Sequence, residues 1–226
     1  MKCLFCQNFP FSQLGNGKTI SVPELAEYYL HLAERGVHNV NFVTPTHFLP
    51  HLFEALLIAR EKGLTLPIVY NTSGYERAEV LQVLEGMVDI YLPDIRYADN
   101  RVAVQLSSVS DYVENDRAAI EEMFRQVGQL QVDDQEIGIQ GLIVRHLVLP
   151  GGLAGTRPSL TWLKEQLGNK IHLSLMCQYF PAHLAPKTPG MDREITHEEY
   201  SEALEILEEL GFENAWAQDP EAWGGA

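Results

Sequence analysis

Basic residues are scarce in this chain. Its 226 residues include 16 Lys and Arg against 31 Asp and Glu, and the formal net charge is −15. A surface with this balance repels phosphate backbones and anionic lipid surfaces. The composition therefore disfavours a nucleic-acid partner and a membrane-surface partner, and we expect neither.

The chain also has few cysteines and no long apolar run. Cys3 and Cys6 lie together at the start and Cys177 stands apart, which is not the pattern of a disulfide framework. We find no charged-then-apolar leader and no apolar run of the roughly 20 residues that would span a bilayer. These features predict a cytoplasmic protein. The length and the 46% hydrophobic content predict one domain, residues 1–226, with a full-sized core.

Short apolar or β-branched runs alternate with longer amphipathic ones along the chain, which is typical of βα units around a parallel sheet. Gly211 and Gly36 end two of the expected helices, and Ser21 and Thr196 begin them. The pattern predicts an α/β barrel, or part of one, with five strand-helix units. The expected strands are 39–43, 68–71, 89–92, 142–149 and 171–179, and the expected helices are 21–36, 46–62, 75–86, 102–106, 114–130, 158–168 and 196–211.

Polar and glycine-rich residues gather where these strands end. In β/α barrels the loops after the strands converge on one face, and that face carries the chemistry. We therefore expect a site at the carboxyl ends of the strands. The segments concerned are 44–47, 71–74, 93–96, 150–152 and 178–179.

The first residues carry a Cys-x-x-Cys pair, Cys3 and Cys6. This spacing alone is weak, because redox loops and zinc sites use it too. The run Cys3-Leu4-Phe5-Cys6-Gln7-Asn8, followed by Phe11-Ser12 and Gly15-Asn16-Gly17, resembles the cluster loop of radical S-adenosylmethionine enzymes, whose full signature is CxxxCxxC. Counting back four residues from Cys3 puts the first cysteine of that signature two residues upstream of Met1.

Further blocks agree with this resemblance in order. They are similar to an uncharacterised group related to pyruvate formate-lyase activating enzymes. The resemblance implies a partial (β/α)6 TIM-like barrel with the cluster loop at 1–18 and the barrel at 19–219. It also implies that this chain is amino-terminally truncated and lacks the first strand. The blocks are Val43-Thr44-Pro45-Thr46-His47-Phe48, Val69-Tyr70-Asn71-Thr72-Ser73-Gly74-Tyr75, Asp89-Ile90-Tyr91-Leu92-Pro93-Asp94 and Val144-Arg145-His146-Leu147-Val148-Leu149-Pro150.

The resemblance implies two cofactors, a 4Fe-4S cluster and S-adenosyl-L-methionine. The reduced cluster cleaves S-adenosylmethionine to a 5′-deoxyadenosyl radical that abstracts a hydrogen atom, and no side chain is expected to be catalytic in its own right. Cys3 and Cys6 would be the second and third thiolate ligands, with Phe5 covering the cluster. The implied partners are a glycyl radical enzyme or another protein or small-molecule substrate, and an electron donor such as flavodoxin or ferredoxin.

Four further positions match places where relatives hold the methionyl or ribose part of S-adenosylmethionine. Thr44 and His47 stand where many relatives carry a glycine-rich, acid-containing strand end. His47 could instead cap the following helix. Asn71 and Ser73 would contact the methionyl or ribose part, although Asn-Thr-Ser-Gly is also an ordinary turn.

Three charged residues complete the expected cofactor site. Arg96 would bind the methionyl carboxylate, with Asp94 anchoring a cation or a loop; a surface ion pair is the alternative. Arg145 interrupts an apolar strand, where an unpaired charge is costly. It should therefore point into the barrel mouth at an anion or pair with a buried acid such as Asp94.

Three other functional hypotheses remain open. A metal-dependent barrel hydrolase would use His47, Asp94 and His146 as ligands. A non-catalytic remnant of the radical S-adenosylmethionine family would keep the fold without the cluster. Cys3 and Cys6 could also be inert or bind zinc. We interpret Cys177, in an expected core strand, as a packing residue.

Overall fold

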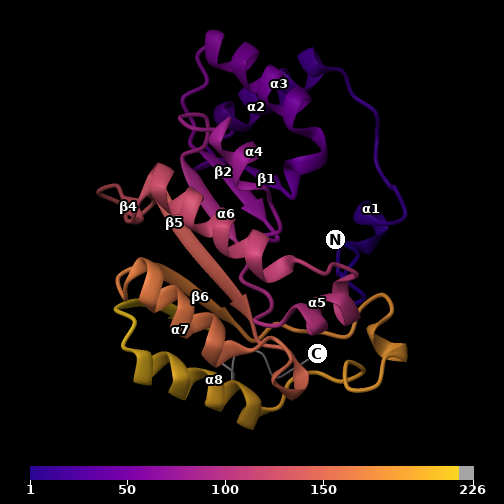
Figure 1. Ribbon diagram of the computed structural model, residues 1–226. Helices are drawn as coiled ribbons and strands as arrows, with labels where there is room; N and C mark the ends of the chain where they lie inside the picture. Colours follow the sequence, from indigo (N-terminus) through magenta and orange to yellow (C-terminus); the bar gives the residue numbers. More distant parts are fainter. Residues whose placement is uncertain (219–226) are drawn as a thin grey trace.

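Six parallel strands form the centre of the computed structural model, which describes residues 1–218 (Figure 1). Their order is β1-β2-β3-β5-β6-β7, and β4 pairs with β5 in the antiparallel direction. Within the described residues the sheet is open, with β1 and β7 at its two edges. The strands are β1 (Val40–Val43), β2 (Ile68–Thr72), β3 (Ile90–Pro93), β4 (Gln131–Val132), β5 (Gly138–Leu147), β6 (His172–Met176) and β7 (Asn214–Ala217).

Helices follow most of the strands, as the alternating pattern predicts. Helices α2 and α3 pack together beside β1 and β2, and α7 and α8 pack together beside β5 and β6 (Figure 1). The α-helices are α1 (Phe9–Ser12), α2 (Val22–Glu34), α3 (Leu49–Glu61), α4 (Ala78–Gln82), α5 (Asn100–Ser107), α6 (Tyr112–Val127), α7 (Thr156–Leu167) and α8 (His197–Leu210). Three 3-10 turns, η1 (Pro45–Phe48), η2 (Pro150–Gly152) and η3 (Ala185–Lys187), lie in the connections.

The prediction of five strands missed two, the two-residue antiparallel strand β4 and the sixth parallel strand β7. The sixth parallel strand, β7, pairs with β6 from His172↔Asn214 onward. Its four residues are half-buried or exposed, so they lack the alternating apolar pattern that identifies a strand in sequence. The final residue of the expected barrel range, 219, lies outside the described part of the chain.

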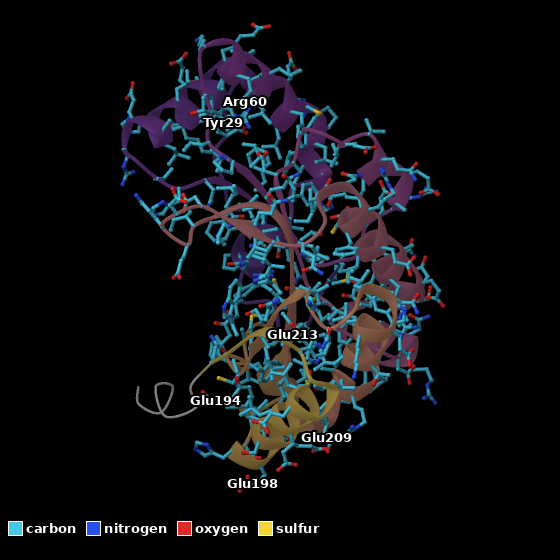
Figure 2. All side chains as sticks on the ribbon, turned by 90° about the vertical axis from the view of Figure 1, so that its left-hand side faces the viewer. Tyr29, Arg60, Glu194, Glu198, Glu209 and Glu213 are labelled. Atoms are coloured by element: carbon cyan, nitrogen blue, oxygen red, sulfur yellow. The ribbon has the colours of Figure 1, made fainter. Side chains whose placement is uncertain are left out.

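The helix ends follow from local chemistry. Ser21 and Thr196 each form a capping box, in which the hydroxyl accepts from the backbone of the glutamate three residues later. That glutamate in turn accepts from the cap residue's own backbone. The solvated face of α8 is acidic and includes Glu198 and Glu209 (Figure 2).

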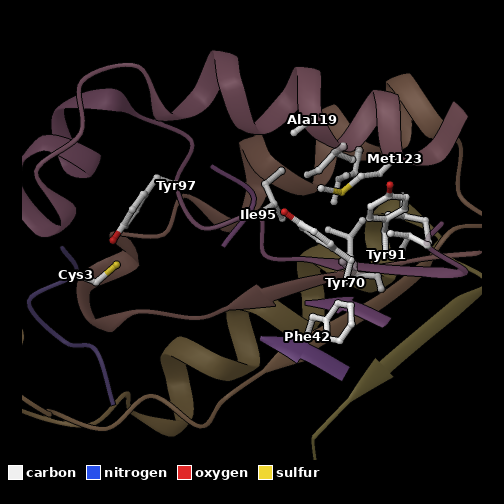
Figure 3. Close-up of a cluster of buried hydrophobic side chains, with 14 of the residues drawn as sticks. Cys3, Phe42, Tyr70, Tyr91, Ile95, Tyr97, Ala119 and Met123 are labelled. Atoms are coloured by element: carbon white, nitrogen blue, oxygen red, sulfur yellow. The ribbon is translucent and has the colours of Figure 1, made fainter. Parts of the chain in front are cut away.

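Tyrosines make up much of the core. Tyr70 and Tyr91 lie on neighbouring strands with ring centroids 5.7 Å apart, and Met123 of α6 lies beside them (Figure 3). Tyr97 and Tyr112 also have almost no exposed surface, and their rings meet edge to face at 5.2 Å. The hydroxyls of Tyr91, Tyr97 and Tyr112 have hydrogen-bond partners, whereas that of Tyr70 has none among the described residues. This core therefore places polar groups beneath the strand ends.

The turn after β2 needs glycine at position 74. Gly74 has a φ of +78°, and a Cβ there would lie 1.9 Å from Oδ1 of Asp116 and 2.3 Å from the carbonyl oxygen of Asp94. Both contacts are far inside van der Waals distance. Gly74 thus allows the β2 and β3 strand ends to approach each other.

We expect Gly74→Ala to lower the free energy of unfolding by on the order of 3 to 5 kcal/mol, because it adds a clash to the strain of positive φ. Gly36→Ala is the matched control, since Gly36 has a φ of +71° with open space around it. Gly36→Ala should lower the free energy of unfolding by about 1 to 2 kcal/mol. Urea unfolding of both variants measures the difference, and equal losses would contradict the close approach.

Candidate functional site

Asp94, directly after β3, is the centre of an ion-pair network at the carboxyl ends of the strands. Its Oδ1 lies 2.7 Å from Nη2 of Arg145, which comes from β5. Its Oδ2 accepts a hydrogen bond from Nη2 of Arg96. Arg145 also donates to Oδ1 of Asn71 in β2, over 2.7 Å. Three strands therefore contribute to one polar cluster.

This cluster is largely shielded from solvent. The side chains of Asp94, Arg96 and Arg145 are 11%, 18% and 23% exposed. The alternative of a surface ion pair for Asp94 and Arg96 was therefore wrong. Arg145 does pair with the buried acid Asp94, which was the alternative to a free anion site. Two guanidinium groups against one carboxylate leave a net positive charge.

The cysteine loop lies against the same network. Sγ of Cys3 accepts a hydrogen bond from Nη1 of Arg96 over 3.1 Å and another from Oγ of Ser107 over 3.1 Å. The loop is held from both sides, because Leu4 donates its N–H to Leu106 and accepts from the N–H groups of Leu184 and Ala185. The expected convergence of Cys3, Asp94, Arg145 and Asn71 at one place is thus present in the structure.

Cys6 and Phe5 differ from Cys3 in their surroundings. Cys6 is half-buried, and its Sγ lies 3.4 Å from Oγ of Ser12. Phe5 is buried, with its ring edge-on to Tyr179 at 5.8 Å. The structure therefore places Phe5 in the core, and its expected role of covering a cluster stays a prediction.

The remaining expected ligands lie at the edge of the network or outside it. Thr44 has a left-handed backbone, and its N–H donates to the carbonyl oxygen of Asn71 over 2.7 Å. His47 is exposed in η1, and no side chain caps α3, which begins after Phe48. Ser73 contributes its carbonyl oxygen, which accepts from the Tyr112 phenol. Their contact with a cofactor stays a prediction.

Two buried acids near the strand ends were missed by the sequence reasoning. Glu76 has 3% exposure, and its Oε1 accepts from the hydroxyls of Thr46 and Thr72. Asp116 lies on the buried face of α6, where burial raises the pKa of its carboxyl well above the usual range. Asp116 shares that face with Ala119, so an acid at an apolar helical position was the available signal.

Several buried polar atoms around the strand ends have no hydrogen-bond partner. They include Nε of Arg96, Nε of Arg145 and Oε2 of Glu76. Each such atom costs about 1 to 3 kcal/mol when unpaired. A ligand with complementary polar groups would recover part of that cost.

His146 is fully buried, and both of its ring nitrogens are engaged. Nδ1 lies 2.8 Å from the carbonyl oxygen of Ile95 and therefore donates, so Nε2 accepts from Thr156 over 3.0 Å. His47, Asp94 and His146 do not form a common centre. Within residues 1–218 no group of three or more His, Cys, Asp and Glu side chains is placed to hold a metal ion, so the described residues do not assemble the hydrolase site.

The chain was compared with protein families, with other sequences and with solved structures. No family model matches the chain. An uncharacterised protein of Methanocaldococcus jannaschii is 32% identical over 222 residues, which cover 94% of this chain and 60% of that protein. The chain thus spans about three fifths of the length of this relative.

Three solved structures share the fold. A domain of pyruvate-formate lyase-activating enzyme from Bacteroides vulgatus matches with a TM-score of 0.55 and 16% identity, over 81% of this chain and all of that domain. HydG, a maturase of the [FeFe]-hydrogenase, matches with a TM-score of 0.61 and 11% identity, over 97% of this chain and 50% of HydG. Methylornithine synthase, PylB, matches with a TM-score of 0.56 and 17% identity, over 91% of this chain and 58% of PylB.

All three are radical S-adenosylmethionine enzymes. At these identities the likeness shows the fold alone, and this chain therefore shares the partial α/β barrel of these three proteins. Among residues 1–218, no helix has both the length and the apolar character needed to cross a bilayer.

The buried imidazole makes the stability of the chain depend on pH. Burial lowers the pKa of His146 to about 4 from 6.5, so the neutral form is favoured in the folded state. The unfolded chain binds the proton first, and stability therefore falls as the pH drops from 6.5 to 4. The loss should reach on the order of 3 kcal/mol.

Urea unfolding across this pH range tests the prediction. His146→Gln should flatten the dependence, whereas His51→Gln, an exposed position in α3, should leave it unchanged. A slope that persists in His146→Gln would assign the effect to other groups.

Proposed function

We propose that this chain is a radical S-adenosylmethionine protein that binds an iron-sulfur cluster through Cys3 and Cys6 and S-adenosylmethionine at the adjoining strand ends. The carrying observation is that Cys3, Arg96, Asp94, Arg145 and Asn71 form one continuous set of hydrogen bonds and ion pairs. The shared fold supports the same conclusion.

The donor set fits the cluster in part. Thiolates are the ligands of iron-sulfur clusters, and Cys3 and Cys6 offer two of them from one turn, in which the Cys6 N–H donates to the Cys3 carbonyl. The Arg96 guanidinium donates a hydrogen bond to the Cys3 sulfur. When bound and reduced, a 4Fe-4S cluster supplies the electron that cleaves S-adenosylmethionine.

The chain's own residues would bind and orient the cofactor. The net positive charge of Arg96 and Arg145 around Asp94 suits a carboxylate, and guanidinium groups bind carboxylates well. The carboxylate of Glu76, fixed by Thr46 and Thr72, suits a cationic group. The surrounding tyrosine core excludes water.

By analogy with pyruvate formate-lyase activating enzyme, the substrate would be a glycyl radical enzyme or another protein or small molecule. A one-electron donor such as flavodoxin or ferredoxin would reduce the cluster. These proposals rest on the fold and on the sequence blocks around the strand ends.

A non-catalytic relative is the second candidate. The observation that favours it is that the residues described here provide two clustered cysteines and no three-ligand metal group. Such a protein would keep the fold and bind a partner or S-adenosylmethionine without cleaving it. Iron content and product formation separate the two candidates.

We expect the 226-residue chain to hold iron poorly after anaerobic reconstitution. Two thiolates leave two irons of a 4Fe-4S cluster without protein ligands, whereas an added upstream segment with a cysteine two residues before Met1 should raise the content to about four irons per chain. Iron and sulfide analysis measures the cluster content of the 226-residue chain and of the extended chain. Cys3→Ala and Cys6→Ala should reduce the content, and Cys177→Ala should not.

Stable, stoichiometric 4Fe-4S in the unextended chain would contradict the two-ligand account. A full cluster in the extended chain without release of 5′-deoxyadenosine after reduction would favour the non-catalytic candidate.

Arg145→Ala should keep the iron but weaken S-adenosylmethionine binding. The substitution removes a shielded cation that faces an anionic group, and such losses are on the order of 2 to 5 kcal/mol, or at least about 30-fold in Kd. Calorimetric titration measures the affinity. Arg157→Ala is the matched control, because Arg157 pairs with Glu209 at an exposed position. Equal effects in the two variants would remove Arg145 from the site.

A further inference from the structure

The two cysteines of the loop have different surroundings. Sγ of Cys3, a residue with 6% exposure, accepts from two donors at 3.1 Å, Arg96 and Ser107. Sγ of Cys6 is half-buried and has a single contact of 3.4 Å with Ser12. A cluster held by both residues would therefore receive its protein hydrogen bonds mainly through one sulfur.

The direction of the Ser107 hydrogen bond follows from its neighbours. The Tyr97 phenol lies 2.6 Å from Oγ of Ser107 and is almost fully buried. The phenol stays protonated and can donate to Ser107, which leaves the Ser107 hydroxyl hydrogen for Cys3. Figure 3 shows the Cys3 sulfur directed towards the Tyr97 hydroxyl.

Arg96 is held in place as firmly as Ser107. Its guanidinium pairs with Asp94, and its backbone N–H donates to the Tyr112 phenol over 3.0 Å. Ser107 has no exposed surface. Neither donor can turn to water without leaving a buried partner unpaired, so both hydrogen bonds to Cys3 are fixed by the fold.

We propose that Ser107 and Arg96 are positioning residues that orient the Cys3 sulfur and raise the reduction potential of a cluster bound there. This inference rests on the proposed function. Hydrogen bonds to cluster sulfurs are among the determinants of reduction potential. A donor stabilises the more negative, reduced state more than the oxidised state, so its removal shifts the potential downwards.

The test is a spectroelectrochemical titration of the anaerobically reconstituted full chain, with 2-mercaptoethanol present as the remaining thiolate ligand. Ser107→Ala should form the cluster and shift its midpoint potential to more negative values. Tyr97→Phe is the matched control, because it removes a hydroxyl from the same buried pocket but leaves the Ser107 hydroxyl beside the sulfur. The control should shift the potential less.

Two further variants complete the design. Ser12→Ala, which removes the longer contact to Cys6, should shift the potential less than Ser107→Ala. Should Ser107→Ala unfold, Arg96→Lys keeps the charge but changes the donor, and it should also lower the potential. Thermal unfolding of each variant identifies any that fail to fold.

The outcomes distinguish the two levels of the proposal. A cluster whose potential is the same in Ser107→Ala and Arg96→Lys as in the parent, or shifts equally in Tyr97→Phe, overturns the inference and leaves the proposed function standing. A parent chain that binds no iron through Cys3 and Cys6 overturns the proposed function and this inference with it.

Discussion

The Asp94 carboxylate is the interaction on which the arrangement of the strand ends depends. It lies between the guanidinium groups of Arg96 and Arg145, and so it joins the end of β3 to β5 and to the cysteine loop. Removing one partner of a buried charge pair is costly, because the other charge is then unpaired. The positions of Cys3 and Arg145 are therefore linked through one carboxylate.

The pairing of Asp94 with Arg96 and Arg145 stabilises this buried polar cluster at the strand ends. The tyrosine core beneath it provides hydrogen-bond partners rather than a purely apolar floor, and Tyr112 lies within reach of the carbonyl oxygens of Ser73 and Asp94. Gly74 lets the β2 and β3 ends come close enough for these contacts. Some buried polar atoms of the cluster, such as Nε of Arg145, have no partner among the described residues.

The alternation of apolar runs was enough to predict the parallel α/β architecture and most of the strands, because buried strands and amphipathic helices have distinct periods. The short edge strand β7 was missed because its residues are partly exposed. The convergence of Asn71, Asp94 and Arg145 was predictable, since the carboxyl ends of parallel strands meet on one face. The hydrogen bonds of Cys3 with Ser107 were not, because they depend on how a terminal loop packs against α5.

Electron spin resonance of the reconstituted and reduced chain, extended upstream by the segment that carries the third cysteine and recorded with and without S-adenosylmethionine, tests the central claim most directly. The account predicts the signal of a reduced iron-sulfur cluster that is lost in Cys3→Ala and changes shape when S-adenosylmethionine is added, because the cofactor binds beside the cluster. A signal that persists in Cys3→Ala, or that is the same with and without S-adenosylmethionine, would contradict it.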